Sequence, residues 1–138
     1  MYNKAVLGMA ETLEAIHVML TQALKEPDRP VAIAVTDDDG NLVAYARMDR
    51  CRSLPQQAAI KKAYTASIMR SDTGALATRM KEQGRSASDF GDPRMIFVQG
   101  GVVIQRADGT VLGGIGVSGL AAAEDEAIAR LGLKAMKL

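Results

Sequence analysis

Apolar side chains recur every three or four positions between residues 3 and 25 of the chain. This spacing predicts an amphipathic helix, which Pro27 and Pro30 end. The apolar stripe of the helix includes the chain's only histidine, His17, which we expect to lie partly buried at the edge of the core. The stripe consists of Val6, Met9, Ala10, Leu13, Ile16, His17, Leu20 and Leu24.

Two short apolar runs, at residues 31–36 and 42–48, follow this helix. The segment between them, residues 37–41, contains three aspartates and a glycine, which is typical of a hairpin turn, so the runs are predicted to form an antiparallel pair of strands. A calcium loop needs alternating oxygen ligands and a closing glutamate between two helices. Consecutive acids between strands do not provide that arrangement, and we expect no metal site here.

The rest of the chain predicts two more helices, three more strands and a closing helix. The helices are expected at residues 54–69 and 74–83, a polar surface loop at 84–93, strands at 95–99, 102–106 and 110–118, and the last helix at 120–136. Turn residues connect most of the strands directly, so the sheet should be antiparallel. The predicted fold is a single α+β domain over residues 1–138, with five strands and helices packed on the sheet.

The strand predicted at 110–118 passes into a glycine run, from Gly113 to Gly119. Its pattern matches the dinucleotide-binding fingerprint, but that fingerprint belongs in a first strand–helix turn, with an acidic residue about 20 positions later on the next strand. Only one predicted helix follows here, and Glu124, Asp125 and Glu126 occupy its first turns. We therefore interpret the run as a strand without side chains, which a helix, a subunit or a flat ligand can approach closely.

Composition narrows the range of functions. The 138 residues are 48% hydrophobic with a formal net charge of +1, which suits one soluble domain and gives no nucleic-acid-binding face. A single cysteine, Cys51, cannot form an internal disulfide, so a reducing compartment is expected. We find no pattern of a signal peptide or membrane span, and predict a cytoplasmic protein without nucleic-acid or membrane partners.

A few polar residues are candidates for chemistry. His17 could be a structural residue, an axial haem ligand or a general base. Lys62 follows Lys61 in the middle of a predicted helix, so one of the two lysines can point into a pocket. Arg47 and Asp49 end a predicted strand, where they could contact a ligand or form a surface ion pair.

Several of these segments together resemble the GlcG/HbpS-like family, which also occurs as the C-terminal domain of PduO proteins. The matching segments are the hairpin from Val31 to Asp49, the helix around Lys62 and Tyr64, the paired Gly100 and Gly101, and the closing run with Gly116 and Ser118 followed by Asp125. The resemblance implies a profilin-like fold, self-assembly into homo-oligomers, and haem or corrinoid binding in some members. It also implies ligand-binding roles for Arg47, Asp49, Tyr64, Gly100, Gly101, Gly116, Ser118 and Asp125.

Three functions stay open at this point. The first is a small-ligand-binding protein, with haem or a related tetrapyrrole as the leading ligand and His17 or a methionine near the iron. The second is a cofactor-independent enzyme of a catabolic pathway, acting on a small hydroxy or carbonyl compound or an aromatic-derived acid. In that enzyme Lys62 or His17 would move protons and Arg47 would pair with a carboxylate. The third is a structural oligomer that supports a partner enzyme.

Overall fold

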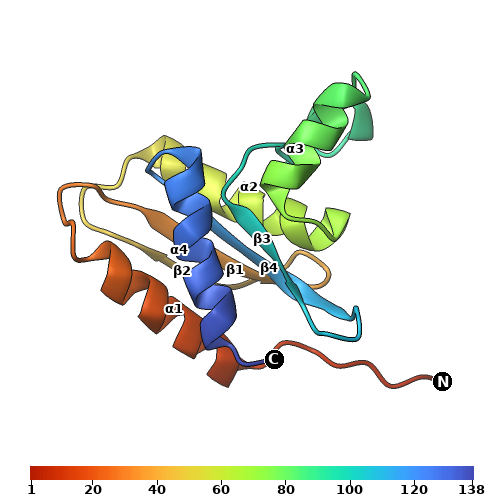
Figure 1. Ribbon diagram of the computed structural model, residues 1–138, viewed down its shortest axis with the longest axis horizontal. Helices are drawn as coiled ribbons and strands as arrows, with labels where there is room; N and C mark the ends of the chain where they lie inside the picture. Colours follow the sequence, from red (N-terminus) through yellow and green to blue (C-terminus); the bar gives the residue numbers. More distant parts are fainter.

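The computed structural model describes all residues, 1–138, and has a four-stranded antiparallel sheet with helices on both faces (Figure 1). The strands are β1 (Ala32–Asp37), β2 (Leu42–Arg47), β3 (Gly101–Gln105) and β4 (Val111–Ser118), in the order β2-β1-β4-β3. The helices are α1 (Met9–Ala23), α2 (Ser53–Met69), α3 (Thr73–Glu82), the short 3-10 helix η1 (Ala87–Phe90) and α4 (Ala122–Ala135). Helices α1 and α4 cover one face, and α2 covers the other. No helix is both long enough and apolar enough to cross a membrane.

The main core lies between the sheet and the pair α1 and α4. Ile33 and Val35 of β1, and Val31 just before the strand, belong to this core together with Ala15 and Met19 of α1. The intervening β1 residues face α2, as the two-residue repeat of a strand requires. The two faces therefore carry different cores, one of branched side chains and one of alanines.

The second core is thin because β4 presents glycine to α2. A Cβ atom added at Gly114 or Gly116 would collide with the backbone carbonyl oxygens of Ala63 or Ala59. The alanines of α2 and the glycines of β4 together let the helix backbone lie directly on the sheet. The sequence suggested a helix, a subunit or a flat ligand as the partner of the glycine run, and the structure places helix α2 there.

The expected fifth strand, at residues 95–99, is wrong, because this segment forms no strand. Side chains instead accept hydrogen bonds from the backbone N–H groups on the outer edge of β3. The Gly101 N–H donates to Oγ1 of Thr73 at 2.8 Å, and the Val103 N–H donates to Oδ1 of Asp72 at 3.0 Å. Because the start of α3 supplies these acceptors, the free edge of β3 has no need of another strand there.

Helix α1 differs from its predicted form in length and orientation. It begins at Met9 rather than at residue 3, and its inward face is formed by Thr12, Ala15, Met19 and Ala23. Small residues on that face allow close packing on α4, where Gly132 leaves no room for a Cβ beside the Met19 side chain. Leu13 and His17 therefore point outward, while Ile16 and Leu20 of the same stripe pack against the core, and the expected partial burial of His17 is wrong.

Candidate functional site

Lys62 and Asp125 form a buried ion pair between α2 and α4. Their residues are 3% and 2% exposed, and Nζ of Lys62 lies 3.2 Å from Oδ2 of Asp125. The ammonium group also donates to the carbonyl oxygen of Val117 at 3.0 Å. Burial raises the pKa of the Asp125 carboxyl, and the hydrogen bond from the Leu120 N–H and the charge of Lys62 oppose that shift.

This ion pair holds the segment that joins β4 to α4. Oδ1 of Asp125 accepts the N–H of Leu120 at 3.0 Å, while its other oxygen faces Lys62. The paired glycines fit around the lysine, because a Cβ at Gly100 would lie 2.7 Å from Nζ of Lys62 and one at Gly101 would lie 2.6 Å from the Lys62 carbonyl oxygen. Four of the site residues predicted from the sequence, Lys62, Gly100, Gly101 and Asp125, thus lie together.

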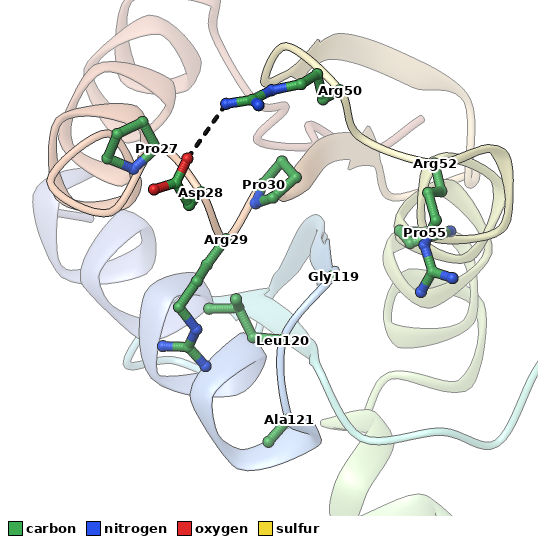
Figure 2. A pocket seen from close by; sticks show the side chains of 10 residues that line it. All are labelled: Pro27, Asp28, Arg29, Pro30, Arg50, Arg52, Pro55, Gly119, Leu120 and Ala121. Carbon is green, nitrogen blue, oxygen red and sulfur yellow. Dashed lines mark hydrogen bonds and ion pairs between the residues drawn. The ribbon is translucent and has the colours of Figure 1, made fainter.

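The same segment also lines a pocket of about 640 Å³ (Figure 2). Residues 119–121 form one wall, and the segments around Pro30 and Pro55 form others. Three arginines line it, Arg29, Arg50 and Arg52, and we call it the arginine pocket. Sequence reasoning did not find this cluster, because only the fold brings the segment after α1 against the segment before α2.

The other expected site residues are spread over the molecule. Gly116 lies beneath α2, and Ser118, which is 8% exposed, continues the same face of β4. Arg47 donates a hydrogen bond to the side chain of Gln56, and Asp49 is exposed in the turn after β2.

Tyr64 belongs to a separate cluster with the loop after η1. Its hydroxyl donates to the carboxylate of Asp92, and the guanidinium carbon of Arg94 lies 4.4 Å from the centroid of its ring. Burial raises the pKa of Tyr64, whereas the hydrogen bonds from Arg94 and then Tyr64 lower the pKa of Asp92 to about 2. This cluster fastens residues 92–94 to α2.

His17 lies on the outer face of α1, across the sheet from Lys62. It borders a shallow depression of about 260 Å³ with Val18, Thr21, Gln22 and Leu131. Large apolar side chains near it are unusually open to solvent: Leu13, one helical turn away, is 58% exposed, and Leu131 of α4 is 39% exposed. The structure therefore does not bring His17 and Lys62 together.

The sequence matches the family model described as "Haem degrading protein HbpS-like" over residues 7–134. The chain belongs to the HbpS-like family. A chain segment of 88 residues is 38% identical to the protein GlcG of Escherichia coli K12, and this match covers 64% of the chain and 63% of the length of GlcG. An uncharacterized 15.0 kDa protein of Citrobacter freundii is 30% identical over 133 residues, which cover 94% of the chain and 87% of that protein.

Solved structures of HbpS-like proteins share the fold. A double mutant of HbpS from Streptomyces reticuli superposes with a TM-score of 0.84 at 27% identity, covering 97% of this chain and 89% of that one. The PduOC:heme complex gives a TM-score of 0.84 at 24% identity, with 95% of both chains covered. The predicted family and the α+β architecture of helices on an antiparallel sheet are confirmed, with four strands in the sheet.

Haem needs an axial ligand and an apolar surface, and the chain offers both at one place. No group of three or more His, Cys, Asp and Glu side chains is close enough to hold a metal ion. A haem iron, however, takes its other ligands from the porphyrin, so one imidazole is sufficient on the protein side. His17 with its apolar neighbours fits that requirement, whereas the arginine pocket contains no histidine, cysteine or methionine.

Proposed function

We propose that this protein binds haem, or a related tetrapyrrole, on the outer surface of α1 and α4, with His17 as an axial ligand. The observation that carries the proposal is that the chain's only histidine is exposed and lies among exposed leucines. A solitary imidazole in an apolar patch is an uncommon surface feature, because large apolar side chains normally pack inward.

The surroundings of His17 suit a flat apolar ring. Leu13 precedes His17 by one helical turn, and Leu131 approaches from α4. Covering such side chains is favourable by roughly 25 cal/mol per Å² of apolar surface removed from water. The family name and the haem complex of PduOC support haem as the ligand to test first.

The depression beside His17 is shallow, so one chain can cover only one face of a porphyrin. A second copy of the chain, placed with its own α1 against the other face, would bury both the ring and the apolar side chains of the helix. We propose a homo-oligomer with haem between two α1 helices. Exposed Met9, Leu13 and Leu24, at 53%, 58% and 57%, extend the apolar surface along the helix on both sides of His17.

A titration of purified protein with haem, followed by the Soret band, tests this proposal. The wild type should give a saturable Soret shift, and His17→Ala should weaken the affinity at least tenfold. Free imidazole should restore the spectrum of that variant because it replaces the missing ligand. A matched control is Gln57→Ala, at an exposed position of α2 on the opposite face. Equal Soret shifts and affinities in the wild type and His17→Ala would contradict the proposal.

The structure gives no comparable support to proton transfer by Lys62. The lysine is buried and bonded to Asp125 and to a carbonyl oxygen, and the sheet separates it from the histidine. Its geometry supports a positioning role for the segment 118–121.

A further inference from the structure

The arginine pocket is a second place where this protein can recognise a ligand. It shares no lining residue with the depression at His17. We propose that the arginine pocket binds a small-molecule oxyanion, a carboxylate or a phosphate group, through Arg50 and Arg52.

The pocket has an excess of positive charge. Three arginines and one aspartate are the charged residues that line it, and Arg29 is paired with Glu26 and Glu124 from outside the lining, so the positive charge available to a ligand comes from Arg50 and Arg52. The arginines come from two segments distant in sequence, the one after α1 and the one before α2, and Figure 2 shows them around the rim of one cavity. Like charges that face one cavity repel one another, and a bound anion would relieve that repulsion.

The three arginines differ in how fully they are paired. Arg29 is engaged by Glu124 and Glu26, each at 2.8 Å, and its side chain turns toward α4. Arg50 pairs with Asp28 at 3.2 Å, but both side chains are largely exposed, at 75% and 90%, so this ion pair is weak.

Arg52 has no carboxylate within ion-pair distance, although it lines the same cavity. Its planar guanidinium group can donate two parallel hydrogen bonds to a carboxylate or phosphate. Arg52 is thus the free cation of the pocket, and Arg50 can exchange an exposed partner for a bound anion.

The start of α2 adds to the positive potential of the pocket. Arg52 precedes the first residue of α2 and Ala121 precedes the first residue of α4, and neither helix has a side-chain cap. The first turn of α2 also contains no acidic residue. The uncapped N–H groups and the positive dipole end of α2 therefore reinforce Arg52, whereas Glu124 and Asp125 in the first turn of α4 offset the positive end of that helix.

The backbone conformation of Arg50 suggests a substitution that should weaken ligand binding without lowering the stability of the fold. Its φ is +67°, in the left-handed region that favours glycine. Arg50→Gly should therefore remove the cation without lowering the melting temperature. Arg70 has a similar φ of +53° at the end of α2 and does not line the pocket, so Arg70→Gly is the matched control.

The test is an NMR titration of the ¹⁵N-labelled full chain with sodium malonate and, separately, with inorganic phosphate, at ionic strength held constant with sodium chloride. Saturable amide shifts should be confined to residues 28–29, 50–54 and 119–123, with a dissociation constant on the order of 1 mM. The more tightly bound probe identifies the preferred class of oxyanion.

Substitutions of the arginines test whether the amide shifts come from binding in the arginine pocket. Arg50→Gly and Arg52→Gln should each raise the dissociation constant at least fivefold, while Arg70→Gly and Arg79→Gln, at an exposed position of α3, leave it unchanged. Shifts that grow without saturation, that sodium chloride reproduces, or that respond equally to all four variants would overturn the proposal. His17→Ala should bind both probes as the wild type does, so failure of haem binding leaves this test intact.

Discussion

Nζ of Lys62 lies 3.2 Å from Oδ2 of Asp125, and both side chains are almost completely buried. This contact connects the middle of α2 with the first turn of α4, while the second carboxylate oxygen fixes Leu120. Helices on opposite faces of the sheet are thereby joined around the end of β4, next to the arginine pocket.

Removing one member of this ion pair should be strongly destabilising. In Lys62→Met the carboxylate of Asp125 would stay buried without its cation, and we expect a loss of about 3–5 kcal/mol in the free energy of unfolding. The double variant Lys62→Met/Asp125→Asn should recover part of this loss, because it has no buried charge and the asparagine can still accept the Leu120 N–H. Urea denaturation of the wild type, the single variants and the double variant measures the coupling. Additive losses would show that the two charges do not depend on each other.

Gly116 of β4, which lies beneath α2, should not tolerate a side chain. In Gly116→Ala the new Cβ would meet the backbone carbonyl of Ala59, which cannot rotate away as a side chain can. We expect a loss of about 3 kcal/mol or more, at or above the upper end for overpacked cores. The matched control is Gly91→Ala, where φ is +69° and no atom lies within 4 Å of the added Cβ, so backbone strain alone should cost about 1–2 kcal/mol. Thermal denaturation monitored by circular dichroism compares the two, and similar losses would contradict close packing of α2.

The cluster of Tyr64, Asp92 and Arg94 should make stability depend on pH in acid. The pKa of Asp92 falls from 3.8 to about 2 on folding, so the folded state favours the ionised carboxylate. Its stabilising effect is complete above pH 3.8 and is lost as the pH falls from 3.8 toward 2. Asp92→Asn should therefore lower the stability at pH 6 and reduce the difference between pH 6 and pH 2. Urea denaturation of both proteins at these two pH values checks this, and parallel pH profiles would contradict it.

Local patterns in the sequence were sufficient for the order of most elements. The hairpin turn with Gly40, the helix that carries Lys62 and the glycine strand that ends near Ser118 all appear where periodicity and turn residues indicate. Strand and helix periods depend on neighbouring residues, and so they can be recognised without the rest of the chain. The family resemblance, which rests on the same segments, was likewise available from sequence.

The remaining features depend on contacts between distant segments. The sequence does not distinguish an apolar residue that faces the core from one that faces a partner. The outward direction of Leu13 and His17 was decided by the packing of Met19 beside Gly132. The fifth strand is absent because Asp72 and Thr73 occupy the β3 edge.

The arginine pocket and the ion pair of Lys62 with Asp125 also depend on contacts between segments that are distant in the sequence. The ion pair joins residues 63 positions apart, and Arg29 and Ala121 line one pocket although most of the chain separates them. The sequence by itself determined most of the helices and strands, though not the absence of a strand at residues 95–99, because these elements depend on local backbone preference and hydrophobic period. The tertiary structure alone decided which side chains meet, because burial, charge pairing and close packing are settled only when distant segments compete for the same space.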